Sequence, residues 1–240
     1  MLSGPNVAAT FNQKAVSSTF YNVSGCPDDL FKYMFRLGLY AREFELAAHM
    51  TCVKFDLGPV LAVEAAIKNW RAPQFDDPDA EFGQAGSCSS ILPDAEAMDP
   101  TEAMHYPQDL HHCAQAWRFA LLLYIERVFK WQRDEPVPPN LGFLARKTLN
   151  NVTSCRPSDM VQKQLLLPVF LAGCETVDDN LREEARKYCF WWGEKTRYNM
   201  FLTTLGLLEE IWENKEPGSW WGSLMDTKCG VSAPRQYLFG

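Results

Sequence analysis

The hydrophobic pattern of the chain is organised around one unusually apolar segment. Residues 119–125 are seven consecutive apolar residues, and they lie inside a longer segment, Leu110–Trp131, that contains neither Gly nor Pro. Such a segment is typical of a helix rather than a strand, and a helix that is apolar on most sides is buried on most sides. Arg118 and Glu126 limit the apolar run to far fewer than the ~20 residues that a membrane span requires. We therefore predict a central, buried helix over residues 110–131.

Apolar residues recur with helical spacing along most of the remaining chain, and no convincing strand or internal repeat is visible. Pro27 suits the first position of a helix, and Asp178 with Asp179 suits the start of another. Pro168 predicts a kink, because proline removes a backbone donor and clashes one turn back. The helices predicted in this way cover residues 26–50, 60–70, 140–152, 160–175, 178–195 and 198–212, with a last helical turn over 220–225.

These elements predict an all-α fold with a single multi-helix domain over residues 26–240, packed around the central helix. Residues 1–25 are interpreted as an irregular N-terminal arm. Residues 72–107 contain five prolines, an acidic cluster and a run of small residues, which predicts a long loop. Loops of this length inside compact domains are usually functional or disordered, so this one is a candidate lid or activation surface.

Composition and charge exclude several classes of function. The formal net charge is -7, whereas a DNA-binding face needs clustered Lys and Arg; we expect no direct nucleic-acid binding by this segment. The eight cysteines form no CxxC pair, and the first residues lack the basic start and apolar run of a secretory signal. Reduced, buried thiols are expected, together with no membrane span and no cofactor.

A metal site is the first candidate chemistry. His111, His112 and Cys113, with His105 nearby, contain two kinds of zinc ligand. Adjacent histidines point about 100° apart on a helix, whereas zinc-binding pairs use i, i+4 spacing. The interpretation we favour is a helix start with solvated histidines, and we predict no metal site.

A helical prenyl-diphosphate enzyme is the second candidate, because Asp76, Asp77 and Asp79 resemble the acidic motif with which terpene cyclases hold magnesium diphosphate. These acids flank a proline in the predicted loop rather than lining a helix. The best second ligand set, Asn199 with Thr203, has leucine where the glutamate is needed. Phosphate-loop, dinucleotide-binding and nucleophile-elbow motifs are absent from the sequence. We predict no catalytic residues and no enzyme activity.

Three stretches together resemble a known family. They are GCPDDL at residues 25–30, AWRFALLLYI at residues 116–125 followed by Arg127, and LPVFLAGCE at residues 167–175, with RYNM, EEIW and Trp220 following. Their order and spacing are similar to the fungal-specific transcription factor regulatory domain that lies C-terminal to Zn2Cys6 binuclear zinc-cluster modules. The likeness covers residues 22–240. The six-cysteine zinc-cluster module itself is absent, so the resemblance implies either part of a longer regulator or a stand-alone relative that has lost DNA binding.

The resemblance implies a nuclear protein, and it allows for shuttling between the cytoplasm and the nucleus. It also implies that the helical domain receives effectors or partners and controls transcriptional activation. One branch of the family binds a sterol in a hydrophobic pocket and forms a dimer. We therefore expect an apolar small ligand, a sterol being one candidate, and a homodimer. The alternative is a protein-interaction domain without a small ligand. The residues expected to line the pocket are Trp117, Leu121, Tyr124, Phe170, Trp192 and Phe201.

Overall fold

The computed structural model describes residues 25–50, 52–71, 100–132, 135–157 and 161–214 together with residues 221, 222 and 224, and it describes residues 100–103 by their backbone alone. All regular elements within this part of the chain are helices, which confirms the all-α prediction. They are α2 (Asp28–Ala48), α3 (Gly58–Asn69), α4 (Pro100–Ile125), the π-helix η2 (Glu126–Lys130), α5 (Pro139–Ser154), the 3₁₀-helix η3 (Gln162–Leu165), α6 (Leu166–Glu175), α7 (Asp179–Thr196) and α8 (Asn199–Glu213).

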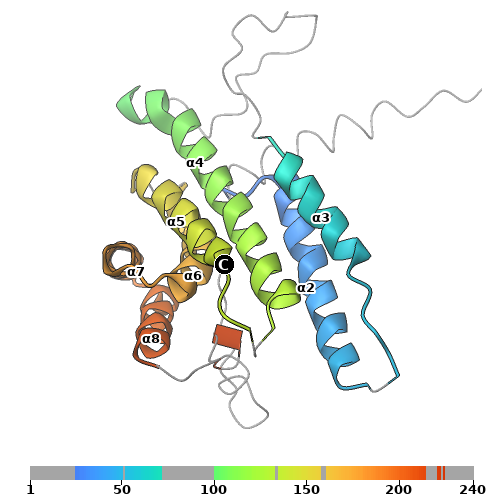
Figure 1. Ribbon diagram of the computed structural model, residues 1–240. Helices are drawn as coiled ribbons and strands as arrows, with labels where there is room; N and C mark the ends of the chain where they lie inside the picture. Colours follow the sequence, from blue (N-terminus) through green and yellow to red (C-terminus); the bar gives the residue numbers. More distant parts are fainter. Residues whose placement is uncertain are drawn as a thin grey trace, which may run out of the picture.

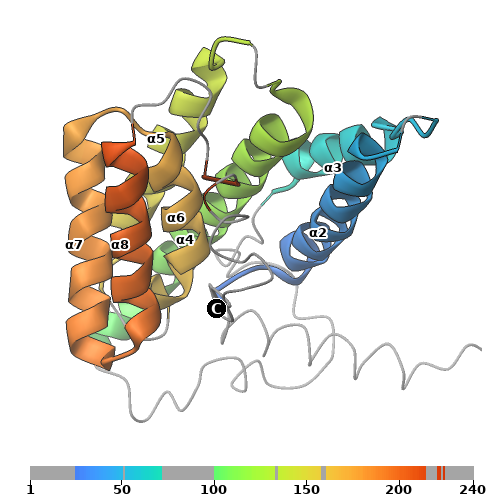
Figure 2. The same cartoon turned by 90° about the horizontal axis from the view of Figure 1, so that it is seen from below.

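Helix α4 runs through the middle of the molecule, as the hydrophobic pattern predicts. The α2–α3 pair lies on one side of it, and α5 to α8 lie on the other (Figure 1). Seen from below, α7 and α8 lie side by side at the edge of the molecule (Figure 2). Helix α6 lies between this pair and α4. Helix α4 packs most extensively on α5 and also contacts α3, α6 and α2. In the described part of the chain, no helix is long and apolar enough to cross a membrane.

The central helix begins earlier than the sequence predicts. Residues 100–107 were expected to belong to the loop, but α4 starts at Pro100 and contains Pro107 in its interior. Proline normally ends a helix because it lacks a backbone donor. Here Tyr106 and Leu110, which are 5% and 1% exposed, bury apolar surface on both sides of Pro107, and this packing outweighs the local cost. Residues 72–99 of the predicted loop, and residues 1–24 of the predicted arm, lie outside the described residues.

The prediction of a kink at Pro168 is wrong. The single helix predicted over residues 160–175 is in fact two elements, η3 and α6. The 3₁₀-helix η3 ends at Leu165 and α6 starts at Leu166, which places Pro168 in the first turn of α6. The N–H groups of a first turn have no partner within their own helix, so proline costs little there. The predicted start at Asp178 is confirmed, since its Oδ1 accepts a 3.0 Å hydrogen bond from the backbone N–H of Asn180.

Close contact between α6 and α8 depends on Gly173. A Cβ atom added at this residue would lie 2.8 Å from Leu208 Cδ2, so a larger residue would require either the Leu208 side chain or α8 to shift. The indole of Trp212 donates a 2.8 Å hydrogen bond to the Gly173 carbonyl. The glycine of the LPVFLAGCE stretch therefore lies where the two helices contact each other closely.

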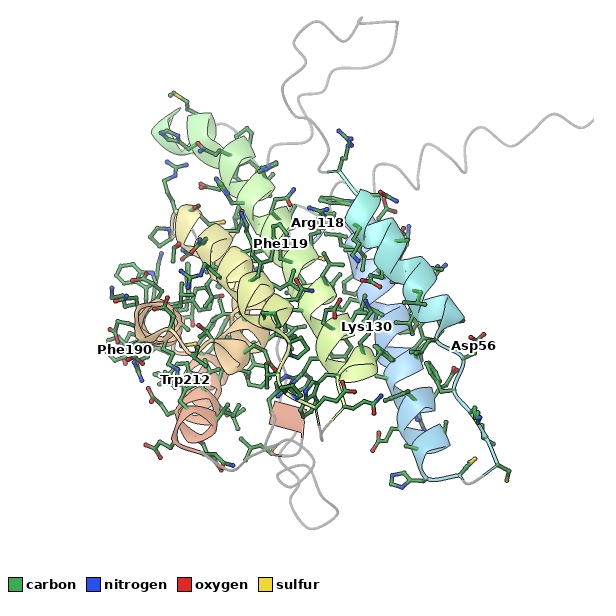
Figure 3. All side chains as sticks on the ribbon, in the orientation of Figure 1. Asp56, Arg118, Phe119, Lys130, Phe190 and Trp212 are labelled. Atoms are coloured by element: carbon green, nitrogen blue, oxygen red, sulfur yellow. The ribbon has the colours of Figure 1, made fainter. Side chains whose placement is uncertain are left out.

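Arg118 illustrates how the charged rim of α4 is used. Its guanidinium donates to the carbonyls of Ile67 at 2.9 Å and Lys68 at 2.6 Å, both in the last turn of α3. The side chain thus caps α3 and ties it to α4 (Figure 3). Cationic groups are favourable at this end of a helix, where the macrodipole is negative.

Candidate functional site

The six residues predicted to line a pocket lie in the interior, but the structure brings them into two clusters. Trp192 of α7 and Phe201 of α8 form the first, with ring centroids 6.5 Å apart. Trp192 is fully buried, and its Nε1 donates a 3.1 Å hydrogen bond to Gln162 Oε1. This cluster joins α7 to α8 and to the segment before α6.

The second cluster lies along one stripe of α4. Trp117, Leu121 and Tyr124 follow each other at helical spacing, and the first two are buried. Tyr124 and Phe170 of α6 each lie 6.1 Å from the ring of Trp221, centroid to centroid. An indole from the C-terminal part of the chain therefore fills the space between the α4 stripe and α6. Burial raises the pKa of Tyr124 to about 12, so its hydroxyl is neutral.

A buried polar atom accompanies this stripe. The Nε1 atom of Trp117 is shielded from solvent and has no hydrogen-bond partner among the described residues. Buried donors are normally paired, and leaving one unpaired costs about 1–3 kcal/mol. Trp117 and Tyr124 are two helical turns apart, roughly 10 Å along α4. The stripe therefore has the Trp221 ring packed against it at the Tyr124 end and a buried hydrogen-bond donor, Trp117 Nε1, at the other end.

A buried ion pair lies beside the cluster formed by Tyr124, Phe170 and Trp221. Arg127 Nε of η2 lies 3.0 Å from Glu175 Oε1, at the end of α6, and the two side chains are only 5% and 4% exposed. The guanidinium carbon of Arg127 stacks 4.0 Å above the centre of the Trp131 ring. The Trp221 indole lies beside Glu175, where it opposes the rise in the pKa of that carboxyl. The Arg127–Glu175 ion pair thus links η2, which continues α4, to the end of α6. Trp221 lies next to this pair.

Burial dominates the titration of this pair. Desolvation raises the pKa of Glu175, against the opposing effects of the Arg127 charge and of the neighbouring Trp221 indole. Desolvation likewise lowers the pKa of Arg127. Removing charges from water costs several kcal/mol per ion, which an ion pair repays only in part. The pair is therefore a costly feature of the interior rather than a simple stabilising contact.

The π-helix η2 explains how Arg127 reaches Glu175. The backbone N–H of Trp131 bonds to the carbonyl of Glu126 at 3.0 Å, a contact five residues back instead of four. The wider turn places Arg127 and Phe129 inside while Glu126 and Lys130 stay at the surface next to α3. Short π-helices occur frequently at functional sites.

Sequence reasoning missed Arg127, Trp131, Glu175 and Trp221 as members of an internal site. A signal was present, because Glu175 follows directly after a strongly apolar run and Arg127 follows another such run by two positions, each at the end of a stretch that carries the family resemblance. Helical periodicity assigns a charged residue at a helix end to the surface by default. It does not anticipate a π-turn that directs the side chain inward.

A surface groove lies elsewhere, between the end of α5 and α7. Its volume is about 670 Å³, and none of the six predicted residues lines it. Its walls are mostly apolar, including Val152, Tyr188 and Trp191, with Glu184 and Glu194 among its lining residues. Phe190 and Trp191 are 58% and 51% exposed, and Phe190 points away from the helix bundle (Figure 3).

The histidines do not assemble with acids or thiols in the described part of the chain, where no group of three or more His, Cys, Asp or Glu residues is placed to hold a metal ion. His112 Nδ1 lies 3.0 Å from Asn151 Oδ1. Cys113 is fully buried, and its thiol donates to the Gly25 carbonyl at 3.1 Å. Asp76, Asp77 and Asp79 lie outside the described residues.

Comparison with known proteins gives one result. The family model described as the fungal specific transcription factor domain matches residues 8–232. This chain belongs to the fungal-specific transcription factor domain family. The family match includes the helices α2 to α8 of the described residues, the Arg127–Glu175 pair and Trp221. No curated protein and no solved structure gives a significant match.

Proposed function

We propose that this fungal-specific transcription factor domain is the regulatory, non-enzymatic part of a zinc-cluster transcription factor, and that it controls activation in the nucleus by binding an apolar small molecule and by forming a homodimer. The family membership supports the regulatory role. The net charge of -7 agrees with a domain that leaves DNA contact to a separate module.

The observation that carries the ligand proposal is the position of Trp221. This indole lies against both Tyr124 and Phe170 and beside Glu175, where it opposes the rise in the pKa of that carboxyl. We assign this arrangement to the closed, ligand-free state. An apolar ligand enters the same space and displaces Trp221, so that binding is coupled to release of the C-terminal segment. Such coupling needs a ligand that binds one arrangement more tightly than the other. Competition between the ligand and the Trp221 indole for the same space provides this difference in affinity.

The unpaired Trp117 Nε1 defines the polarity of the ligand. A molecule that lies along the Trp117–Leu121–Tyr124 stripe meets an unused donor at the far end. A single hydroxyl or carbonyl oxygen on an otherwise apolar body satisfies this donor. A sterol has this chemistry. Phe170 forms the opposite wall, while Trp192 and Phe201 stabilise the adjacent α7–α8 pair rather than contact the ligand directly.

A protein-interaction domain without a small ligand is the second candidate function. The groove between α5 and α7 favours it, because Phe190 and Trp191 are large apolar side chains that remain exposed beside acidic residues. Aromatic residues of this kind are enriched at the centres of protein interfaces.

Ligand binding to the wild type and to Trp221→Ala separates the two candidates. Thermal shift against a panel of sterols and fatty acids, with affinity from tryptophan fluorescence, is the measurement. We expect at least one sterol to raise the Tm of the wild type. We expect Trp221→Ala to bind it about tenfold more tightly, because the ligand no longer competes with the indole. Trp191→Ala is the matched control, since it removes an exposed tryptophan away from the stripe.

Absence of any shift in both proteins would contradict the ligand proposal. Equal affinity of the wild type and Trp221→Ala would place the ligand elsewhere. A reporter assay with the domain fused to a heterologous DNA-binding module tests the regulatory role separately. A reporter that responds to Trp191→Ala but to no ligand would favour the interaction domain.

A further inference from the structure

The groove between the end of α5 and α7 is large enough to hold one small molecule. Its volume of about 670 Å³ lies within the roughly 300–1,000 Å³ that is usual for small-molecule sites. Its α7 wall extends from Glu184 to Glu194, which is roughly 15 Å of helix. No residue of the Trp117–Leu121–Tyr124 stripe lines it. The groove is therefore a candidate ligand site that is separate from the interior one.

The polar groups of the groove that could bind a ligand by hydrogen bonds already have partners within the protein. Gln162 Nε2 donates to the carbonyls of Val152 and Cys155 at 3.2 and 2.8 Å, and Gln162 Oε1 accepts from Trp192. The Tyr188 hydroxyl donates to the Gln162 carbonyl at 3.0 Å. These groups leave a ligand with apolar contacts rather than with free hydrogen-bond donors.

The charges that line the groove leave one carboxylate without a compensating cation. Lys187 Nζ lies 2.8 Å from Glu184 Oε1, so these two lining residues offset each other. Glu194 is exposed and lines the groove, and within the described part of the chain it forms no ion pair. Arg156 does not line the groove and is held by Asp109 at 2.9 Å.

The end of α5 adds further negative potential. Val152 and Thr153, in the last turn of α5, line the groove, and this turn contains no basic residue. The C-terminal end of a helix carries the partial negative charge of the macrodipole. Together with the Glu194 carboxylate, this end of α5 makes the groove electronegative. A cation is therefore the complementary charge.

Aromatic rings lie beside the Glu194 carboxylate. Trp191 and Phe190, which are 51% and 58% exposed, line the groove and precede Glu194 by three and four residues on α7. Side chains at these spacings are neighbours on the surface of a helix. The face of an aromatic ring attracts a cation, and tryptophan does so most strongly. A carboxylate beside two exposed aromatic rings is a combination that recognises ammonium groups.

We propose that this groove binds a small organic cation that carries a substituted ammonium group on an apolar body. The ammonium group lies between Glu194 and the rings of Phe190 and Trp191, and the apolar body lies along Tyr188 and Val152. A quaternary ammonium requires no hydrogen-bond partner, which fits a groove whose other polar groups are already paired. The inference goes beyond the proposed function, because it adds a second ligand site at the surface.

A charged probe and its uncharged isostere test whether the groove recognises the cation. The probes are the hydroxyphenyl-trimethylammonium ion and tert-butylphenol, in which carbon replaces the nitrogen. Titration of the full chain, followed by isothermal calorimetry and ligand NMR, gives both dissociation constants. We expect a constant on the order of 100 μM for the cation. We expect about fivefold weaker binding of tert-butylphenol, because it has neither the ion pair nor the cation–π contact.

Variants of the two recognition groups test the position of the site. Glu194→Gln should weaken binding of the cation about threefold and leave binding of tert-butylphenol unchanged, since only the charge is removed. Trp191→Leu should weaken binding of the cation about fivefold, because leucine keeps an apolar side chain but has no ring face. Glu45→Gln, an exposed acid on α2, is the matched control and should bind both probes as the wild type does. Circular dichroism checks that each variant is folded.

Equal affinity of the wild type for the two probes would show that charge is not recognised, and it would overturn the inference. A wild type that binds neither probe at millimolar concentration would also overturn it. Full selectivity for the cation in both Glu194→Gln and Trp191→Leu would place the cation elsewhere, with the same consequence. Trp221→Ala should bind the cation as the wild type does, because Trp221 does not line the groove. The fate of this inference is therefore distinguishable from that of the interior ligand.

Discussion

The π-helix η2 carries two ion-pair systems that differ in their exposure to water. On its inner side, Arg127 meets Glu175 in the core, with both side chains nearly inaccessible. On its outer side, Lys130 lies 2.7 Å from Glu64 and 2.9 Å from Glu126, and Lys68 lies 2.6 Å from the same oxygen of Glu64. Figure 3 shows Lys130 on the side of α4 that faces α2 and α3.

The difference between the two systems shows how water decides the value of a charge. Lys130 and Lys68 are 30% and 58% exposed, so they keep much of their hydration and Glu64 receives two cations. Burial raises the pKa of Glu64, but its hydrogen bonds to Lys130 and Lys68 outweigh this effect and the net pKa is lowered. Glu175 has one cation and almost no water, and its net pKa is raised. The outer system stabilises the fold, whereas the inner one mainly specifies how η2, α6 and Trp221 fit together.

The largest expected effect comes from removing one member of the inner pair. Glu175→Ala should lower the free energy of unfolding by about 3–5 kcal/mol, because it leaves the Arg127 charge buried without a partner. Chemical denaturation followed by circular dichroism measures this loss. The double variant Arg127→Met with Glu175→Met should recover most of it, since neither charge then needs hydration. A double variant as unstable as Glu175→Ala would show that shape, rather than charge, dominates the site.

A smaller effect is expected from the outer system. Glu64→Gln should cost about 1 kcal/mol, because it weakens hydrogen bonds to two partly solvated cations. Denaturation at low and at high salt provides the measurement. The cost should shrink at high salt, where the screening length becomes short, while the cost of Glu175→Ala should change little. A Glu64→Gln cost that is independent of salt would contradict the comparison.

The smallest expected effect is an opposite pH dependence of the two carboxyl groups. Because the pKa of Glu175 is raised on folding, its contribution is fully present below the unfolded pKa, roughly 4.3, and is lost as pH rises through its folded pKa. The pKa of Glu64 is lowered, so its contribution is present above that unfolded value and is lost as pH falls through its folded pKa.

Stability curves of Glu175→Gln and Glu64→Gln, each compared with the wild type from neutral pH down to a pH below the unfolded carboxyl pKa of roughly 4.3, measure this difference. On acidification, the cost of Glu64→Gln should shrink and the cost of Glu175→Gln should grow. Parallel curves would show that the two environments do not differ in the stated way.

Much of the fold could be predicted from the sequence because helices with one buried face repeat their apolar residues at a fixed spacing. Helix α8, for example, was predicted over residues 198–212 and is observed at Asn199–Glu213. The errors occurred at prolines: the proline content of residues 72–107 led us to start the central helix only after Pro107, and the expected effect of a proline inside a helix led us to predict a kink at Pro168. At Pro107, tertiary packing of the neighbouring residues decided the outcome. At Pro168, the position within the first turn of α6 decided it.

The candidate site was predictable only in part. Tyr124 and Phe170 were expected to face each other across the core, and both contact Trp221. Trp192 and Phe201 were expected beside them but form their own cluster between α7 and α8. Periodicity shows which residues point inward, but it does not show which inward residues from different helices share a space.

The sequence by itself determined the helices, the all-α class and the family, since each depends on residue types at fixed local spacing. Only the tertiary structure decided that Arg127 and Glu175, far apart in the chain, meet in the core, and that an indole from the C-terminal segment lies against them. A buried charge is tolerated only where its partner is held in place. That requirement depends on how α4, η2 and α6 pack together, which no single stretch of sequence contains.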